Sequence, residues 1–279
     1  MPHNYQTSEQ DRAHISIVMP CYNEEAIIGY TIPRLMKAFE RSGYRLELIA
    51  VDNGSWDRTG EIIKDLAAQW DSLILHRVEV NQGYGYGVIS GVTRATAPWV
   101  GVIPADGQVD AEDVVRLYEA VVVTDGQVFG KVRRRFRMDG FHRDVVSFGY
   151  NLLFRLLWPQ IRSSDINGNP KIMPRQAAQV MNLKSKDFLI DPEMMIKSHH
   201  MGLRVLELNV FGRMRGNGES HVRMGTAWEF FRYLLRFRFS REWKAEFNRV
   251  AEAMKEPAPA SPAHASEPMV SLEKSENLP

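Results

Sequence analysis

The stretch HISIVMPCYNEEAIIGYTIPRLMKAFERSG, from His14 to Gly43, decides the fold class. Its opening residues, His14 to Pro20, form a short hydrophobic run followed by a turn, which predicts a buried strand. The rest of the stretch places apolar side chains at helical spacing, which predicts a helix. A buried strand that leads into an amphipathic helix is the repeating unit of an α/β sheet.

The same strand and helix unit recurs along the next part of the chain. RLELIAV (45–51) precedes a predicted helix from Trp56 to Trp70, and SLILHRVEV (72–80) precedes another from about Tyr84 to Ala97. WVGVIP (99–104) supplies a fourth strand. This alternation predicts a mostly parallel sheet with helices on both faces, and such sheets bind ligands outside the carboxyl ends of their strands. Four turns therefore belong to one rim: CYNEE (21–25), DNGSWDRTG (52–60), NQGYGYG (81–87) and ADGQ (105–108).

Length and composition predict one large α/β domain. The chain has 279 residues, and its 35 Lys and Arg residues nearly balance its 34 Asp and Glu residues. The overall charge therefore favours neither an acidic nor a basic partner. The single cysteine, Cys21, excludes an intrachain disulfide and fits a reducing compartment. We expect Cys21 to face the core, because no neighbouring feature marks it as an activated nucleophile.

The two ends of the chain differ from its middle. Residues 1–13 are polar and are expected to be flexible, without a secretion signal. Residues 255–279 are rich in Pro, Ala and Ser and carry few large apolar side chains, which predicts a disordered tail. No window approaches the roughly 20 apolar residues of a membrane-spanning helix. The expected location is the cytoplasm, with any membrane contact peripheral.

A basic segment and two aromatic helices follow the first four strands. KVRRRFRMDGFHR (131–143) contains five arginines and one lysine. This run fits a phosphate-binding segment, a solvated face or an RNA contact. The predicted helices are VVSFGYNLLFRLLW (145–158) and TAWEFFRYLLRFRF (226–239), and the second places Trp228, Phe231, Leu235 and Phe239 on one face. Such helices pack in a core or lie in a membrane interface.

Two motifs carry little information by themselves. GYGYG (83–87) lacks the spacing of a dinucleotide fingerprint, which favours a turn that opens a helix. DNGSWDRT (52–59) follows a strand and enters a helix, with Ser55 or Asp57 as the expected N-cap. The spacing of the eight histidines does not indicate a zinc site.

The order of the motifs is more specific than any one of them. PCYNEE, DNGSWDRT and the segment from Asn81 to Val114 resemble the nucleotide-sugar half of family 2 glycosyltransferases. The resemblance continues through about Phe239 in the order found in polyprenyl-phosphate sugar synthases, the branch that contains dolichyl-phosphate mannose synthase. The later matching segments are VRRRFRMDGFHRDVVSFGYN, SSDINGNPKIMPR, FLIDPEMMIKSHHMGLRVLELNV and RMRGNGESHV.

The resemblance implies a GT-A fold, a Rossmann-like and mostly parallel sheet flanked by helices, with C-terminal amphipathic helices. The glycosyltransferase domain would cover residues 14–240, with a nucleotide-sugar half at about 14–130 and an acceptor half at about 131–240. A terminal helix (241–254) and the tail would follow. The implied reaction moves a sugar from a nucleoside-diphosphate sugar to a polyprenyl phosphate, with inversion, on the cytoplasmic membrane surface. Homo-oligomers are compatible with this assignment.

By similarity, the nucleotide-sugar pocket draws on three of the rim turns. Asn53 stands where the family usually has a second aspartate, and an amide can donate as well as accept a hydrogen bond from a base. The preferred nucleotide can differ accordingly. The matching positions are Pro20, Tyr22, Glu24, Val51, Asp52, Asn53, Ala105 and Asp106.

VIPADGQ (102–108) matches the Asp-x-Asp segment with which the family binds a divalent cation. Pro104 occupies the position of the first aspartate, so Asp106 and Gln108 remain as candidate ligands of Mg²⁺ or Mn²⁺. Because Mg²⁺ is often held by one or two protein oxygens plus phosphate and water, we expect a weakened site. The cation would stabilise the departing nucleoside diphosphate.

The acceptor side is implied to be basic. Arg215 precedes a Gly-Glu-Ser-His segment in which His221 replaces the usual lysine, making that contact pH-sensitive. Glu193 matches a recurring acidic position in the active-site wall. The catalytic candidates are thus Asp106, Arg215 and Glu193. The candidate acceptor-phosphate ligands are Arg134, Arg137, Arg143, Ser220 and His221.

Two further hypotheses stay open at this point. The acceptor could be a soluble sugar or small molecule instead of a lipid. Because Pro104 and Asn53 replace two usual carboxylates, the chain could also be a catalytically silent nucleotide-sugar-binding protein. We do not expect a nucleic-acid partner, because the arginine run occupies the acceptor position of the family.

Overall fold

The strand predicted from the His14 run is β1 (Ile15–Cys21), which is buried at every position. The computed structural model describes residues 12–135, 141–163, 165–211 and 224–254. Alternate side chains of β1 enter two apolar clusters. Ile15, Ile17 and Met19 belong to one cluster and Val18 to the other. The strand is therefore hydrophobic on both faces, as expected for a sheet covered on both sides.

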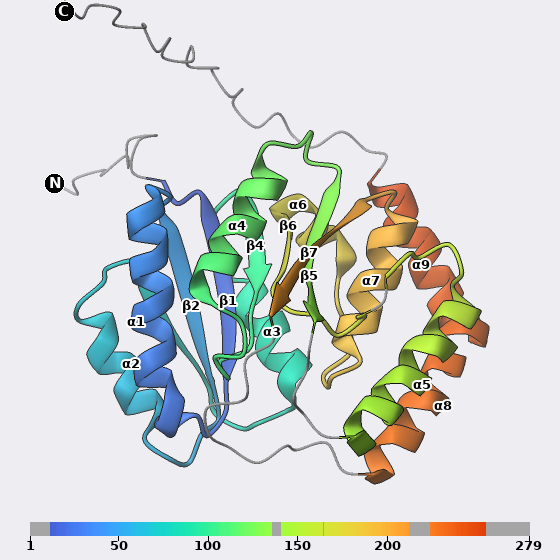
Figure 1. Cartoon of the computed structure of the whole chain (residues 1–279), viewed down its shortest axis with the longest axis horizontal. Helices are drawn as coiled ribbons and strands as arrows, with labels where there is room; N and C mark the ends of the chain where they lie inside the picture. The colour runs from blue at the N-terminus through green and yellow to red at the C-terminus, as the bar shows by residue number, and fades with distance from the viewer. Residues whose placement is uncertain (1–11, 136–140, 164, 212–223, 255–279) are drawn as a thin grey trace, which may run out of the picture.

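Seven strands form one sheet in the order β3-β2-β1-β4-β6-β5-β7 (Figure 1). β6 is antiparallel to its neighbours β4 and β5, whereas the other pairings are parallel. The predicted mostly parallel sheet is confirmed. The remaining strands are β2 (Leu46–Asn53), β3 (Leu73–Val78), β4 (Trp99–Val102), β5 (Val128–Arg135), β6 (Lys171–Pro174) and β7 (Arg204–Phe211).

The direction of β6 determines which loops meet. Val102, at the end of β4, pairs with Lys171, at the start of β6. The turn that precedes β6 therefore lies at the carboxyl edge of β4. Because β5 and β7 run in the same direction as β4, their carboxyl ends reach that edge too. The rim thus includes parts of the acceptor half as well as the four turns predicted from the sequence.

Helices cover both faces of the sheet. α1, α2 and α4 pack on one face, and the other cluster contains residues of α3 and α5–α9. α5 lies beside α8, which in turn contacts α9 (Figure 1). The helix bounds are α1 (Glu25–Ser42), α2 (Thr59–Ala67), α3 (Tyr84–Val92), α4 (Ala111–Val122), α5 (Phe141–Leu157), α6 (Arg175–Met181), α7 (Ile190–His200), α8 (Met224–Phe239) and α9 (Arg241–Ala253).

Several local predictions are met, and others need correction. Cys21 is buried, as expected, and burial raises the pKa of its thiol. α2 begins at Thr59 instead of Trp56, and α3 ends at Val92 instead of Ala97.

The predicted tail and most of the predicted N-terminal segment lie outside the described residues. Within the described residues, no helix combines the length and apolar character needed to span a bilayer.

A buried ionic cluster joins α9 to α7. Lys197 is fully buried, and its ammonium group lies 2.7 Å from Glu193 and 3.3 Å from Glu246. Burial opposes the charge of Glu246, but hydrogen bonds from Arg249 and two lysines lower its pKa from 4.5 to about 2. The carboxylate therefore stabilises the docking of α9 as long as it is ionised.

We expect Glu246→Gln to lower the unfolding free energy at pH 7 by about 1.5–3 kcal/mol, the contribution of hydrogen bonds to a charged group. Because the folded pKa lies below the unfolded one, this contribution is complete above about pH 4.5 and disappears as the pH falls toward 2. Urea unfolding of both proteins at several pH values measures the difference. A difference that stays constant down to pH 2 would contradict the assignment.

Candidate active site

The turns after β1 and β2 are joined by reciprocal hydrogen bonds. The Asn23 amide donates to Ser55 Oγ at 3.1 Å, and the Trp56 amide donates to Asn23 Oδ1 at 3.1 Å. The Glu24 amide donates to Thr59 Oγ1 at 2.8 Å. These side chains bind backbone amides of the opposite turn just before α1 begins, which fixes the turn that carries Tyr22 and Glu24.

The expected N-cap of α2 needs correction. The N-cap residue is Arg58, not Ser55 or Asp57. Ser55 accepts from the β1 turn instead, and Asp57 accepts from the Glu25 amide at 3.1 Å and from the Thr59 amide at 2.9 Å. Residues 56–58 are therefore part of the contact between the two turns, which explains why the helix starts later than predicted.

Close packing of α3 shapes the floor of the rim. A Cβ atom on Gly91 would lie 2.3 Å from Val18 and 2.9 Å from Val51, so only glycine lets the helix approach these strands. Val51 and Ala105, two of the predicted nucleotide-pocket residues, are both buried. They lie beneath the rim, whereas Tyr22 and Glu24 are partly exposed on it.

Asn53, the last residue of β2, is buried beside the rim turn 81–87. Its buried amide nitrogen donates to Asn81 Oδ1 at 3.3 Å and to the Gly83 carbonyl at 3.0 Å. Its Oδ1 has no hydrogen-bond partner among the described residues. Both amide hydrogens of Asn53 are thus used within the protein, and its role toward a base stays a prediction. Asn53 suits a base with a ring N–H, as an aspartate would.

Asp52 stabilises the β2 turn. Its Oδ1 accepts from the Ser55 amide at 3.0 Å, and its Oδ2 lies 3.5 Å from the Arg77 guanidinium. The carboxylate is almost fully buried, so these contacts hold the backbone that presents Asn53.

The predicted metal ligands lie together on the turn after β4. Asp106 Oδ1 accepts from the Gln108 amide at 3.1 Å, and Gly107 between them has φ of +66°. Asp106, Gln108 and Pro104 line one cavity together with Arg134 and Asn169. Within the described part of the chain, no three acidic, His or Cys side chains form a metal-binding cluster. One carboxylate and one amide oxygen fit a hard cation that takes its other ligands from a diphosphate and water.

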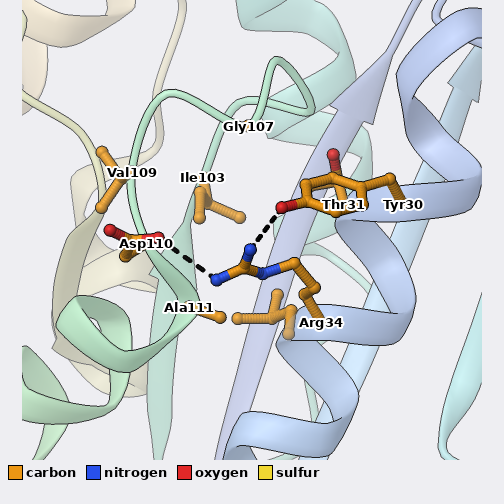
Figure 2. Close-up of a pocket in the computed structure, with 9 residues that line it drawn as sticks. Tyr30, Thr31, Arg34, Ile103, Gly107, Val109, Asp110 and Ala111 are labelled. Atoms are coloured by element: carbon orange, nitrogen blue, oxygen red, sulfur yellow. Dashed lines mark hydrogen bonds and ion pairs between the residues drawn. The ribbon is translucent and has the colours of Figure 1, made fainter. Parts of the chain in front are cut away.

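Contacts with α1 hold this turn from its other side. Figure 2 shows Arg34 of α1 between Tyr30 and Asp110, with hydrogen bonds to both. The distance between Arg34 Nη2 and Asp110 Oδ1 is 3.3 Å. Thr31 also donates to the Ala105 carbonyl at 3.2 Å. The loop that carries Asp106 and Gln108 is thus anchored at both ends.

Arg134, at the end of β5, is the acceptor-side candidate that the described structure brings into the same cavity. Its Nε and Nη2 each donate to the Asp165 carboxylate at 3.0 Å. Burial lowers the pKa of Arg134, but Asp165 raises it above its ordinary value. Burial likewise opposes the charge of Asp165, while Arg134 holds that carboxyl's pKa well below its usual range. Both groups therefore stay charged.

Sequence reasoning missed a second buried pair at this edge. Lys171 Nζ lies 2.5 Å from Asp191 Oδ1, and Asn169 Nδ2 donates to the same oxygen at 3.2 Å. Burial lowers the pKa of Lys171 to about 8, although Asp191 opposes that shift. A lysine directly before the apolar residues of β6 was the available signal, because a buried charge needs a partner.

Glu193 lies two residues after Asp191, yet it contacts backbone and does not line the cavity. Its fully buried carboxylate accepts from the amides of Lys184 and Ser185 at 2.9 and 2.8 Å, and it pairs with Lys197. These bonds shape the loop 182–189. A role for Glu193 in the wall of the site would therefore be indirect, through this loop.

Most of the predicted acceptor-side residues lie on two segments that follow β5 and β7. Arg137, Arg215, Ser220 and His221 lie outside the described residues, and only the backbone of Arg143 is described, in the first turn of α5. The segments that carry them leave β5 and β7, which are adjacent in the sheet. Both segments therefore start at the carboxyl edge.

The chain belongs to glycosyltransferase family 2. The sequence profile described as "Glycosyl transferase family 2" matches residues 16–201. Solved structures share the GT-A fold. Glucosyl-3-phosphoglycerate synthase from Mycobacterium tuberculosis, in complex with Mn²⁺, UDP-glucose and phosphoglyceric acid, aligns with a TM-score of 0.62 and 17% identity over 88% of this chain and 82% of that one.

Relatives known by sequence include polyprenyl-phosphate sugar transferases. The dolichol-phosphate mannosyltransferase of Pyrococcus furiosus is 25% identical over 85% of this chain. The undecaprenyl-phosphate 4-deoxy-4-formamido-L-arabinose transferase of Pectobacterium carotovorum is 32% identical over 52% of it. The chain spans 66% and 44% of the lengths of these relatives. An uncharacterized glycosyltransferase of Mycobacterium tuberculosis is 30% identical over 75% of this chain and 89% of its own.

Proposed function

We propose that the chain transfers a sugar from a nucleoside-diphosphate sugar to a polyprenyl phosphate at a membrane surface, with inversion at the anomeric carbon. One observation carries the proposal: a single cavity is lined by Asp106 and Gln108, which suit a cation and diphosphate, and by Arg134, which suits a phosphate. Two relatives are named as dolichol-phosphate and undecaprenyl-phosphate sugar transferases, which supports the choice of a polyprenyl phosphate as acceptor.

On the donor side, Asp106 and Gln108 would hold Mg²⁺ or Mn²⁺ against the diphosphate. When bound, the cation supplies compensation for the negative charge that develops on the departing nucleoside diphosphate. The hydrogen bond from the Gln108 amide fixes the Asp106 carboxylate before substrate binds. Asn53 Oδ1 would accept from the base at the other end of the nucleotide.

On the acceptor side, a phosphate is largely ionised at neutral pH. Its oxygen attacks the anomeric carbon while the bond from that carbon to the diphosphate oxygen breaks. No strong general base is needed, so positioning and charge compensation are the main contributions. Arg134, oriented by Asp165, would place the phosphate, and Arg137, Arg143, Arg215, Ser220 and His221 remain proposed as further ligands.

The membrane-surface part of the proposal is supported by α5 and α8. Leu156 and Phe239 are 70% and 64% exposed, and Leu152 and Leu235 are exposed on the same two helices. Leu234 and Phe237 of α8 are buried, so the helix has both a core face and an outer apolar face. Arg232, Arg236 and Arg238 interrupt that outer face and suit anionic headgroups.

We expect the double variant Leu156→Glu/Phe239→Glu to lower binding to vesicles of phosphatidylglycerol and phosphatidylcholine by at least about 10-fold, because two apolar contacts are replaced by charges that anionic lipids repel. Vesicle co-sedimentation measures this. Val123→Glu is the control, because Val123 is 83% exposed just after α4, away from α5 and α8. Equal binding of all three proteins would remove the support from α5 and α8.

A soluble phosphate is the second candidate acceptor. The structures of glucosyl-3-phosphoglycerate synthase hold phosphoglyceric acid, and Arg134 suits a phosphate of either origin.

The test is an incubation of the protein with a panel of nucleoside-diphosphate sugars and either polyprenyl phosphate or 3-phosphoglycerate, with Mg²⁺, Mn²⁺ or chelator. Mass spectrometry identifies products. We expect a glycosyl polyprenyl phosphate from one donor, formed faster with metal. Product from phosphoglycerate alone would reassign the acceptor, and binding without turnover would favour a silent binding protein.

A further inference from the structure

Tyr84 carries a buried hydroxyl group at the start of α3. Tyr84 is the first residue of α3, and its hydroxyl oxygen has no hydrogen-bond partner among the described residues. Buried phenols usually find one, because an unsatisfied polar group is costly to desolvate. Because the described residues leave this hydroxyl unsatisfied, it is available to a ligand.

The Tyr84 ring is held in place, so the hydroxyl cannot turn toward solvent at low cost. The ring stacks on Phe188 with centroids 5.4 Å apart and planes 14° from parallel. The Tyr86 amide donates to the Lys186 carbonyl at 3.0 Å, which ties α3 to the loop 182–189. A Cβ on Gly83, which has φ of +104°, would lie 2.3 Å from the same carbonyl. Glu193 fixes that loop from behind through the Lys184 and Ser185 amides.

The groups that act on the Tyr84 hydroxyl come from both sides of the candidate site. Burial raises the pKa of the phenol, and the carboxylates of Asp191 and Asp106 raise it further, while Arg134 opposes them. Asp106 is the proposed donor-side ligand, and Arg134 is the proposed acceptor-side ligand. Asp106 and Arg134 line the candidate cavity, and Tyr84 begins the helix that follows the rim turn 81–87, so the hydroxyl belongs to the same rim as the site.

We propose that the Tyr84 hydroxyl hydrogen-bonds a hydroxyl group of the transferred sugar and helps to select the donor. The inference rests on the proposed function and adds a sugar contact to it. A neutral phenol can donate one hydrogen bond and accept others, which matches a sugar hydroxyl. A phosphate needs only donors and already has Arg134 and the cation. A base would use Asn53, which the Gly83 carbonyl holds in place.

The burial of the Tyr84 hydroxyl would also let the site discriminate between donor sugars. A site built to hydrogen-bond a substrate hydroxyl discriminates strongly against an analogue that lacks it, because the protein group is then left unpaired. In the absence of sugar, Tyr84 already carries that cost, and the correct sugar removes it. The contact thus favours sugars that present a hydroxyl at the matching position over deoxy analogues and other epimers.

The test compares Tyr84→Phe with wild type and with the control Tyr86→Phe, whose ring lies under Lys186. Tyr84→Phe keeps the ring on Phe188 and removes only the hydroxyl. Without ligand, its Tm should rise by about 2 to 4 °C, because an unsatisfied buried group is gone. Calorimetry with UDP and GDP should give wild-type affinity. The kcat/KM for the preferred donor sugar should fall about 10- to 100-fold, and discrimination among UDP-glucose, UDP-galactose and GDP-mannose should shrink.

Two results would overturn the proposal. A lower Tm for ligand-free Tyr84→Phe would mean that the hydroxyl has a partner within the protein, whatever the activity. Unchanged kcat/KM and unchanged discrimination would mean that the sugar does not contact it.

Binding measurements distinguish a failure of the proposed function from a failure of the sugar contact. Suppose that wild type binds a sugar nucleotide more tightly than the matching UDP or GDP but transfers the sugar to no polyprenyl phosphate. The proposed function is then wrong. If Tyr84→Phe binds the sugar nucleotide and the free nucleotide equally well, the sugar contact is still supported. If wild type binds none of the sugar nucleotides more tightly, both proposals fail.

Discussion

Asp106→Ala is expected to lower the rate of sugar transfer by about 100- to 1,000-fold, the range seen when one group that stabilises transition-state charge is removed. Asp106 is the sole carboxylate in the described turn after β4 that lines the cavity with Gln108. Because Pro104 supplies no ligand, the loss of Asp106 would leave one amide oxygen for the cation. Steady-state kinetics over a range of Mg²⁺ and Mn²⁺ concentrations measures the effect.

The control for this variant is Asp125→Ala. Asp125 pairs with Arg204 at 2.9 Å before the start of β5, at the opposite edge of the sheet, and it should keep full activity. Wild-type rates for Asp106→Ala would exclude the metal assignment. A large loss in Asp106→Ala that extra metal partly restores would support it.

Arg134→Ala is expected to lower the unfolding free energy by about 3–5 kcal/mol, because removal of one member of a buried ion pair leaves an unpaired charge. Asp165 is buried and accepts two hydrogen bonds from the Arg134 side chain. The double variant Arg134→Met/Asp165→Leu should recover much of this loss, since both charges are then absent. Urea unfolding of the three proteins provides the comparison.

The catalytic role of Arg134 needs a variant that stays folded. Arg134→Lys keeps a charge but cannot bind Asp165 through two nitrogens and still offer a third nitrogen to a phosphate, so kcat/KM for the acceptor should fall while the affinity for the nucleoside-diphosphate sugar stays unchanged. The stabilised double variant should remain inactive. Full transfer activity in the double variant would show that Arg134 serves stability alone.

The first half of the fold was predictable because its signals are local. Each strand from β1 to β4 is a short apolar run bounded by turn residues, and the helices between them carry apolar side chains at helical spacing. The carboxyl rim followed from the parallel arrangement. The structure adds contacts that fix the rim: Ser55, Asp57 and Thr59 bind the backbone amides of Asn23, Glu25 and Glu24, where α1 begins.

The strands of the acceptor half were not predictable from periodicity. β5 contains Lys131 and β6 contains Lys171, and both lysines are fully buried. Their partners Glu207 and Asp191 lie far away in the sequence, so a window of a few residues shows an isolated charge in a strand. The contacts of Asn53 could not be predicted either. Its side-chain nitrogen donates to Asn81 and to the Gly83 carbonyl, which belong to another loop.

The candidate site was predicted in part by the resemblance to a family. The structure brings Asp106, Gln108 and Arg134 to one cavity. The contacts of Glu193 and Tyr84 depend on the loop 182–189, whose conformation no motif specifies. Tertiary contacts, more than residue type, decide what these two side chains can do.

The most direct test of the account is mass-spectrometric detection of a glycosyl polyprenyl phosphate formed by wild type and by Asp106→Ala from the same donor panel. The account predicts one glycolipid from wild type and almost none from the variant. A glycolipid formed equally by both proteins would contradict the assigned site, and its absence with wild type under every donor and metal condition would contradict the proposed function.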